Sequence, residues 1–349
     1  MSATTTVIKA SCLCGKANFT VTLPSTSLPL RSWICHCDTC RKNQGSIALF
    51  HTEIPALDSA SVSPLSVYKT SENSNRYFCP VCGCHPCEWD EGVRKWYLST
   101  GVIQREDFPL IEFTEHIFIE DTKDGGLSNW LPSVNGKLLK RWSHHARKSQ
   151  ELPLSWASSE LQSTPSDKLR ARCSCGGVDF YISRPLFDSP EFRKDFPDLK
   201  IPSETVPRSK EHWFIAKDKQ KWIAGFCTCT SCRLANGMDV MSWTYVPTSL
   251  ITPADGSSHR LEFGTLKRYQ SSDKVIRRFC GKCGATVFYQ VDHRPNLVDV
   301  AVGLLESTSG AKAEDWLEWR KDDFSFRDEA RDTKLVEELL HGYQAQQQR

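Results

Sequence analysis

The amino-acid sequence predicts a mainly β protein built from two tandem compact modules and a short C-terminal helix. The chain has 16 cysteines in 349 residues, and fourteen of them form one ordered set of motifs that occurs twice. The candidate strands are short, rich in β-branched and aromatic residues, and separated by Gly and Pro. Apolar residues with helical spacing occur only in the tail, between Asp328 and Leu340.

The composition excludes several classes of protein. Hydrophobic residues make up 39% and charged residues 25% of the chain, which is enough apolar material for packed cores. No apolar run approaches the length of about 18–20 residues that a membrane span needs. The first residues, MSATTTVIKASCLC, lack the apolar region of a signal peptide, so we expect a cytoplasmic protein without a membrane partner. In such a protein many cysteines indicate metal binding rather than disulfides.

The cysteine motifs fix the order of the repeat. The first copy contains Cys12-Leu13-Cys14-Gly15, then Cys35-His36-Cys37-Asp38-Thr39-Cys40-Arg41, then Phe78-Cys79-Pro80-Val81-Cys82-Gly83. The second copy contains Cys173-Ser174-Cys175-Gly176, then Cys227-Thr228-Cys229-Thr230-Ser231-Cys232-Arg233, then Phe279-Cys280-Gly281-Lys282-Cys283-Gly284. Tyr68 and Tyr269 also occupy matching places before the third motif. We therefore expect two copies of one module.

The copies set the predicted domain boundaries. Residues 1–142 form copy one, 143–168 a Ser-rich linker, 169–325 copy two, and 326–349 a helical tail. Copy two has an insertion at 184–222 with several prolines, which is either a surface excursion or a lid over a site. The expected strands are 17–23, 47–50, 96–102 and 112–119 in copy one, and 178–182, 241–246, 285–291 and 297–302 in copy two.

The spacing of the first and third motifs indicates structural zinc. A Cys-x-x-Cys-Gly motif supplies two thiolates, whereas a structural zinc site has four ligands in a tetrahedron. We therefore expect the first motif of each copy to share a zinc ion with the third. The predicted ligands are Cys12, Cys14, Cys79 and Cys82 in copy one, and Cys173, Cys175, Cys280 and Cys283 in copy two.

The middle motif supplies three thiolates, Cys35, Cys37 and Cys40 in copy one and Cys227, Cys229 and Cys232 in copy two. Three protein ligands and one open position are typical of catalytic zinc, although a remote His, Asp or Glu would close the site structurally. We expect up to four zinc ions per chain, two of them labile or catalytic. Zinc held by three thiolates acidifies water weakly but binds a further soft thiolate well, which favours a thiol substrate.

Several residues near the motifs have two possible roles. Arg41 and Arg233 either hold a substrate carboxylate and balance the anionic centre, or form ordinary surface pairs. Cys84 and Cys87 are either buried spare thiols or a redox or auxiliary metal pair. His36 has Thr228 in its place in copy two, so we expect it to line the site rather than to bind the metal.

These motifs in this order resemble the glutathione-dependent formaldehyde-activating enzyme family, which includes the centromere protein V domain. The resemblance covers most of residues 7–132 and 169–320. It implies a zinc-bound β fold, a structural zinc at the paired motifs and a labile zinc at the triple motifs. It also implies chemistry that joins the sulfur of glutathione to formaldehyde. Most members have one module, so this chain resembles a covalent pseudo-dimer.

Three functions remain open from the sequence. The first is a zinc-dependent carbon–sulfur lyase-type enzyme that acts on the adduct of a thiol, glutathione, and a carbonyl compound, formaldehyde. The second is a tailoring enzyme of a specialised pathway that performs an elimination, isomerisation or cyclisation on the same scaffold. The third is a non-catalytic zinc module that binds a partner. A net charge of only +2 argues against nucleic acid as that partner.

Overall fold

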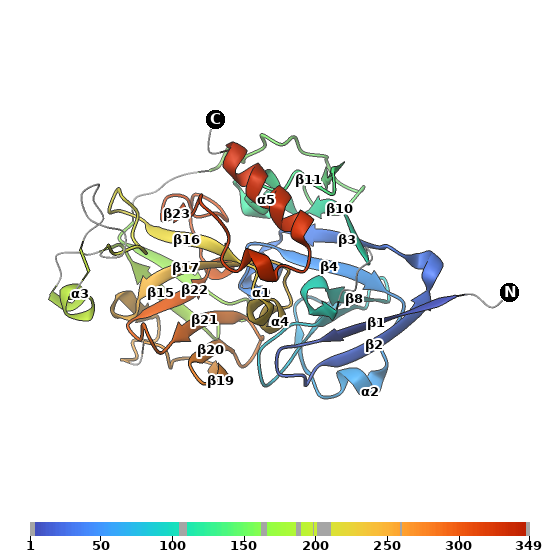
Figure 1. Ribbon diagram of the computed structural model, residues 1–349, viewed down its shortest axis with the longest axis horizontal. Helices are drawn as coiled ribbons and strands as arrows, with labels where there is room; N and C mark the ends of the chain where they lie inside the picture. The colour runs from blue at the N-terminus through green and yellow to red at the C-terminus, as the bar shows by residue number, and fades with distance from the viewer. Residues whose placement is uncertain are drawn as a thin grey trace.

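Two sheet-rich halves make up the molecule, one for each copy of the repeat (Figure 1). In this computed structural model, residues 4–104, 110–161, 166–185, 190–197, 199–200, 211–258 and 260–346 are described. The blue and green half contains copy one, and the lime to red half contains copy two. The predicted mainly β class with a C-terminal helix is confirmed.

Copy one contains a three-stranded and an eight-stranded sheet, with orders β2-β1-β9 and β13-β10-β3-β4-β8-β7-β6-β5. Two further strands, β11 and β12, form a hairpin. The strands are β1 (Thr5–Ser11), β2 (Asn18–Pro24), β3 (Leu30–Cys35), β4 (Leu49–Ile54), β5 (Ser66–Lys69), β6 (Ser74–Phe78), β7 (Cys87–Asp90), β8 (Lys95–Ser99), β9 (Ile103–Gln104), β10 (Ile111–Ile117), β11 (Ser133–Val134), β12 (Lys137–Leu138) and β13 (Lys140–Arg141).

Copy two repeats the large sheet with seven strands in the order β19-β20-β21-β22-β17-β16-β23, whereas its three-stranded sheet, β14-β15-β18, has the second strand of the hairpin at its centre. Its strands are β14 (Lys168–Arg172), β15 (Asp179–Ser183), β16 (Trp222–Cys227), β17 (Met241–Pro247), β18 (Ile251–Pro253), β19 (Leu266–Ser272), β20 (Val275–Cys280), β21 (Thr286–Val291), β22 (Leu297–Ala301) and β23 (Leu317–Trp319). The α-helices in the described part of the chain are α1 (Asp38–Gln44), α2 (Ser59–Val62), α3 (Pro190–Asp195), α4 (Thr230–Asn236) and α5 (Thr333–Gln346).

Strand register relates the copies residue by residue. Cys35 pairs with Leu49 between β3 and β4, and Cys227 pairs with Met241 between β16 and β17. In both large sheets the next neighbours run in the same order, β8-β7-β6-β5 in copy one and β22-β21-β20-β19 in copy two. The matched register allows each position around one three-cysteine motif to be compared with its counterpart.

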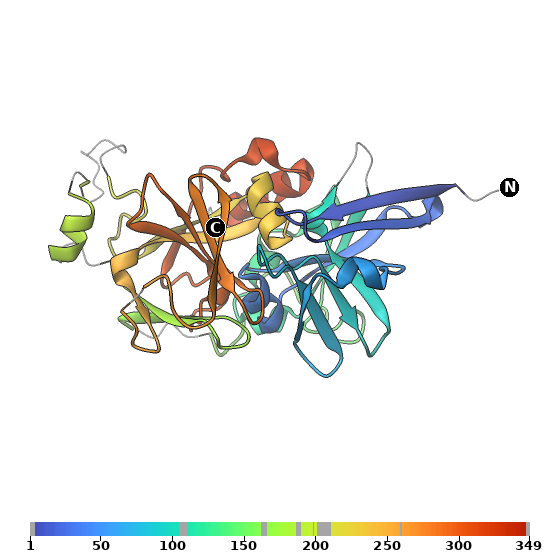
Figure 2. The ribbon, with the colours of Figure 1, turned by 90° about the horizontal axis from the view of Figure 1, so that it is seen from below.

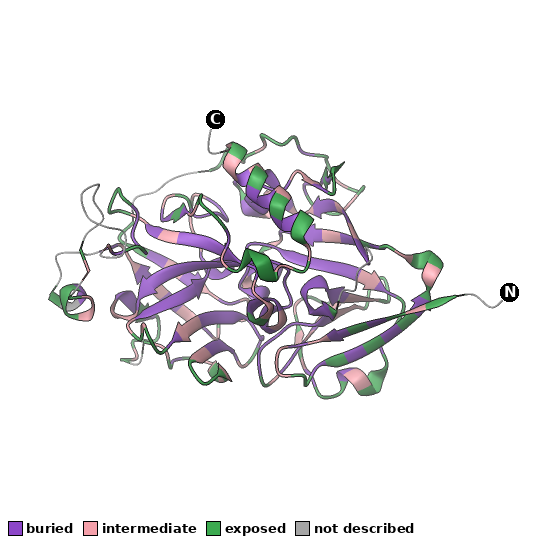
Figure 3. Cartoon of the chain, in the orientation of Figure 1, coloured by how far each residue is buried: buried purple, intermediate pink, exposed green. Residues whose placement is uncertain are grey.

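The two copies share one continuous core, as the purple centre of Figure 3 shows. Helices α1 and α4 lie between the halves (Figure 1), and each ends at a glycine in the left-handed conformation. A Cβ on Gly45 would lie 2.3 Å from the carbonyl oxygen of Thr286, and one on Gly237 would lie 2.7 Å from that of His85. These glycines therefore end the helices and also let the backbones of the two copies meet.

The C-terminal helix α5 connects the copies at the top of Figure 1. Its Tyr343 hydroxyl donates a hydrogen bond to the carbonyl oxygen of Trp319 in copy two, while its ring packs edge-on against Trp130 of copy one. The apolar spacing predicted the helix over 328–340, whereas it runs from Thr333 to Gln346. No helix in the described part of the chain is long and apolar enough to cross a membrane.

The predicted linker and the insertion of copy two have no counterpart in the repeat, and their surroundings differ. The first part of the predicted linker, 143–152, packs on copy one, because the backbone N–H of Phe118 donates to the carbonyl oxygen of His144 and that of Leu152 donates to the carbonyl oxygen of Arg141. Much of the insertion, residues 186–189, 198 and 201–210, lies outside the described residues. Figure 2 shows helix α3 of the insertion at the far end of copy two. The domain boundaries themselves stay a prediction.

We expect Gly101→Ala to destabilise both copies together. A Cβ at Gly101 would come within 2.5 Å of the backbone of Gly237 and Met238 across the interface. Overpacking of this kind costs about 1–3 kcal/mol, so thermal unfolding should show one transition at a lower midpoint. Gly225→Ala is the control, because its new Cβ would make only ordinary contacts with Arg320. Two separate transitions, with copy two unchanged, would contradict the shared core.

Candidate metal centres and active site

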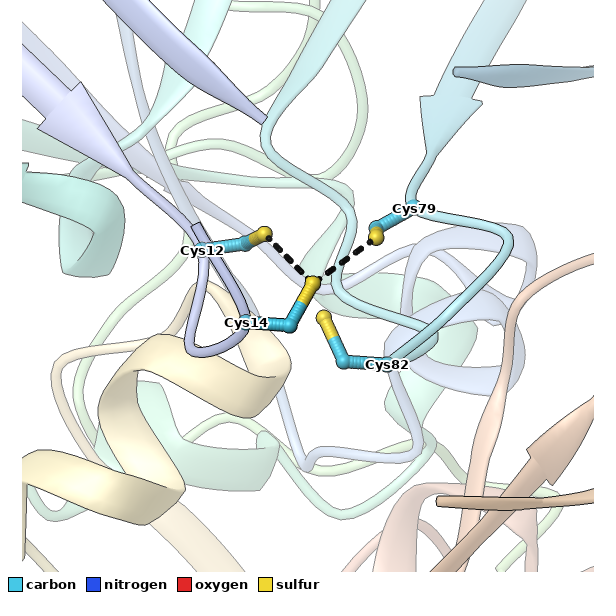
Figure 4. A group of neighbouring side chains, drawn as sticks. All are labelled: Cys12, Cys14, Cys79 and Cys82. Atoms are coloured by element: carbon cyan, nitrogen blue, oxygen red, sulfur yellow. Dashed lines mark hydrogen bonds between the residues drawn. The ribbon is translucent and has the colours of Figure 1, made fainter. Parts of the chain in front are cut away.

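In each copy the cysteines of the first and third motifs come together in one cluster of four. The loop after β1 supplies Cys12 and Cys14, and the turn after β6 supplies Cys79 and Cys82 (Figure 4). The Sγ atoms of Cys12 and Cys14 are 3.6 Å apart, and those of Cys14 and Cys79 are 3.4 Å apart. In copy two the Sγ atoms of Cys173, Cys175, Cys280 and Cys283 likewise lie within 4.8 Å of one another.

Both clusters fit a tetrahedral zinc ion. Zinc–sulfur bonds of about 2.3 Å place neighbouring sulfurs about 3.8 Å apart, close to the distances here. Backbone N–H groups also point at sulfur, from Ala17 to Cys12 and from Val178 to Cys173, both at 3.3 Å. Such hydrogen bonds stabilise negatively charged thiolates, which are the form of cysteine that binds metal.

The two three-cysteine clusters sit at helix N-termini. Cys37 is the N-cap of α1 and its Sγ accepts a hydrogen bond from the backbone N–H of Cys40 at 3.3 Å; Cys229 does the same for α4 with Cys232 at 3.2 Å. The N-terminus of a helix carries unpaired N–H groups and partial positive charge, which favour thiolate. The Cys-x-x-Cys spacing thus places two sulfurs where the backbone stabilises their negative charge.

The thiols of each cluster disturb one another's ionisation. Hydrogen bonds to Cys37 and Cys40, and then burial, raise the pKa of Cys35 well above its ordinary value. A hydrogen bond with Cys35, followed by one with Cys40, lowers the pKa of Cys37. Neighbouring buried sulfurs cannot all be ionised cheaply, because their charges repel in a low dielectric. A divalent cation relieves this repulsion, so all four clusters are suited to zinc.

An arginine that the sequence analysis missed lies beside each three-cysteine cluster. Arg76 on β6 places Nη2 3.0 Å from Cys40 Sγ and also pairs with Glu88 at 3.0 Å. Arg277 on β20 places Nη1 3.6 Å from Cys232 Sγ. Both side chains are buried. The repeat could have indicated these two arginines, because an Arg stands three residues before Cys79 in copy one and three residues before Cys280 in copy two.

Arg41 and Arg233, which the sequence analysis singled out, make other contacts than Arg76 and Arg277. Arg41 is buried, pairs with Asp38, and donates from Nε to the carbonyl oxygen of His36 at 3.1 Å. Arg233 donates to the carbonyl oxygen of Gly101 across the interface between the copies. Their predicted contact with a substrate stays a prediction, and the contacts that the structure shows are structural.

A cavity of about 980 Å³ opens beside the three-cysteine cluster of copy one. Its wall combines the sulfurs of the cluster with Arg76, and aromatic side chains face the same space: Trp33, His51, Tyr97 and Phe118. All its lining residues lie between 30 and 148, so the cavity belongs to copy one and to the segment predicted as linker. His145 and Lys148 of that segment form part of its wall.

Larger or different side chains stand at the matching positions of copy two. The register places Gly225, Trp243 and Tyr245 where copy one has Trp33, His51 and Glu53. Trp213, from the insertion, packs edge-on against Tyr245 with ring centroids 4.8 Å apart. Tyr289 stands at the position of Glu88, and the guanidinium of Arg277 lies 4.8 Å from its ring centroid. The surroundings of the two three-cysteine clusters are therefore chemically different.

The other residues near the motifs are buried. Cys84 and Cys87 belong to none of the clusters found among the described residues, and burial raises the pKa of both thiols. These are the properties of buried spare thiols rather than of reactive ones. His36 and His116 share a hydrogen bond of 2.9 Å between Nε2 and Nδ1 in the core. His36 is therefore structural and does not line the cavity.

We expect the two kinds of cluster to respond differently to mutation. Structural zinc contributes about 10–16 kcal/mol of apparent binding energy, comparable with the whole stability of a domain, so Cys12→Ser should unfold the protein. Cys37→Ser should leave it folded but with about one metal ion fewer per chain. Elemental analysis and circular dichroism test this, with Cys84→Ala as the control. A folded Cys12→Ser variant with full stability would contradict the structural role.

We expect Arg76→Met to weaken metal binding at copy one alone. The variant keeps the length of the side chain but removes the positive charge beside Cys40, and changes next to metal ligands lower affinity about 10–100-fold. Competition with a chromogenic chelator measures this affinity. Arg31→Met is the matched control, because Arg31 also lines the cavity but pairs with Glu115. Equal effects of the two substitutions would contradict a specific role for Arg76.

Comparison with known proteins identifies the family of the chain. No curated protein matches this chain. A crystal structure of a Rhodobacter sphaeroides protein is similar at 16% identity and a TM-score of 0.24, over 43% of this chain and 99% of that one. The family model described as "Glutathione-dependent formaldehyde-activating enzyme" matches residues 7–121 and 215–320, which is more than half of the chain. The chain therefore belongs to the glutathione-dependent formaldehyde-activating enzyme family, with two regions that match its domain.

Proposed function

We propose that this protein is a zinc-dependent enzyme that makes or breaks a carbon–sulfur bond between a thiol and a carbonyl compound, and that copy one carries the activity. The observation that carries the proposal is the cluster of Cys35, Cys37 and Cys40 at the wall of a cavity of about 980 Å³. The family name suggests glutathione as the thiol and formaldehyde as the carbonyl compound.

The chain's own residues suit this chemistry. Cys35, Cys37 and Cys40 would hold the metal, which supplies a binding position for a further soft ligand such as a thiolate. Arg76 offsets the negative charge that three thiolates place there. Aromatic side chains in the same wall provide apolar surface against which a bound thiol substrate can pack.

A larger substrate is the second candidate, because of the size and composition of the cavity. Ligand sites usually measure about 300–1,000 Å³, and this cavity lies at the upper end of that range. Trp33, Tyr97 and Phe118 offer aromatic surface that neither formaldehyde nor the glutathione backbone requires. An aromatic carbonyl compound or its thiol adduct, transformed in a specialised pathway, would use that surface.

We expect Cys37→Ser to abolish activity and Cys229→Ser to preserve most of it. The cluster of copy one lines the cavity, so loss of its metal removes the site, whereas Cys229 and the other two cysteines of its cluster do not line that cavity. Proton NMR exchange of formaldehyde with glutathione measures the rate above the spontaneous reaction. Parallel assays with an aromatic aldehyde separate the two candidate substrates.

Loss of activity in Cys229→Ser but not in Cys37→Ser would show that copy two carries the activity. Equal losses in both variants, with folding and the other metal sites intact, would show that the copies act together. No acceleration by the metal-loaded wild type with either aldehyde would remove the enzyme proposal and favour a binding module. Elemental analysis of each variant provides the control for metal content.

A further inference from the structure

His51 is a buried imidazole without a hydrogen-bond partner at the wall of the cavity. It lies on β4 and is 8% exposed, and neither Nδ1 nor Nε2 has a partner among the described residues. Buried polar atoms are nearly always hydrogen-bonded, because an unpaired one costs free energy. Since His51 lines the same cavity as Cys35, Cys37 and Cys40, the missing partner points to a ligand there.

Aromatic neighbours fix the orientation of this imidazole. His51 pairs across the sheet with Trp33 on one side and Ser99 on the other. Its ring centroid lies 4.8 Å from that of Trp33, edge to face, and 5.7 Å from that of Tyr97. Burial, and then the positive charge of Arg76, lower the pKa of His51 to about 3. The ring is therefore neutral and offers one N–H donor and one acceptor.

The carboxylates of the cavity wall already have partners. Glu88 accepts from Arg76 and from Ser74, and Glu115 accepts from Arg31 and Trp142. Asp121 accepts the backbone N–H of Asp38 at 3.1 Å. His51 thus differs from these acidic residues, because its hydrogen-bonding groups are not used by the fold.

Copy two shows that the sheet does not require an imidazole here. The register places Trp243 at the position of His51, between Gly225 and Ala301 on the two neighbouring strands. Trp243 is buried in copy two, so an apolar aromatic ring satisfies this place in the fold. The imidazole of copy one is therefore an addition to the module rather than a part of its core.

We propose that His51 is a catalytic residue of copy one that hydrogen-bonds the oxygen of the carbonyl compound. This rests on the proposed function. In the reaction the sulfur lone pair forms the carbon–sulfur bond, and the π pair of the carbonyl group moves to oxygen. The N–H of His51 stabilises the charge that develops on that oxygen, and the proton lost by the thiol ends there as the hydroxyl group of the adduct.

The kinetic test replaces His51 by Phe and by Gln. His51→Phe keeps an aromatic ring against Trp33 but has no N–H, whereas His51→Gln keeps an N–H donor. Loss of a donor to a developing oxyanion costs about 100-fold in kcat. We therefore expect His51→Phe to lose about that factor while the KM for the thiol stays unchanged, and His51→Gln to retain more activity.

Controls separate this role from a structural one. Elemental analysis and the unfolding midpoint should match the wild type in both variants, and His293→Phe, an exposed histidine of copy two, should keep full activity. A His51→Phe variant with wild-type kcat would overturn the proposal and leave the proposed function intact. A rise in the KM of the thiol alone would also overturn it, since that places His51 at the thiol.

A binding test does not depend on turnover. In ¹⁵N-histidine-labelled, metal-loaded protein, the imidazole signal that His51→Gln removes identifies His51. We expect this signal to shift when glutathione and formaldehyde are added together, and to stay in place with glutathione alone. A signal that ignores the mixture would overturn the proposal. A shift without any acceleration of the reaction would support the contact with oxygen while the proposed function fails.

Discussion

Repulsion between buried thiolates is the constraint on which the rest of this structure depends. Fourteen cysteines gather into four clusters whose sulfurs lie within 4.8 Å of one another. Without a cation, each cluster must keep protons on some of its thiols, as the opposite pKa shifts of Cys35 and Cys37 show. The fold therefore brings together thiols that can all be ionised at once only when a metal ion neutralises them.

The interface between the copies extends this dependence from one module to the other. Tyr68 of copy one lies against the four-cysteine cluster of copy two, where burial and the charges of Cys283, Cys175 and Cys173 raise its pKa. Tyr269 of copy two has the reciprocal place beside Cys82, Cys14 and Cys12. Each of the matching tyrosines thus lies beside the four-cysteine cluster of the other copy. The contacts are reciprocal, as in an isologous dimer interface, but they occur within one chain.

Repetition explains which parts of the site could be predicted from the sequence. The four clusters could be predicted from the cysteine spacing, because cysteines only two or three residues apart can bind the same metal ion. Arg76 acts on a sulfur 36 positions away, and only its recurrence as Arg277 marks it in the sequence. His51 has Trp243 in its place in copy two, so the repeat does not indicate it. Only its place in the cavity wall and its missing hydrogen-bond partners do.

The same contrast explains why two copies with equal ligands need not have equal functions. Both three-cysteine clusters cap a helix at the shared interface, so their geometry contributes to the core of the whole molecule. The positions that face the cavity in copy one do not cap a helix. Copy two has Trp243 and Tyr245 at two of them, and Tyr245 packs against Trp213. The three cysteines and the helix that they cap are thus common to both copies, whereas the side chains beside the cluster differ between them.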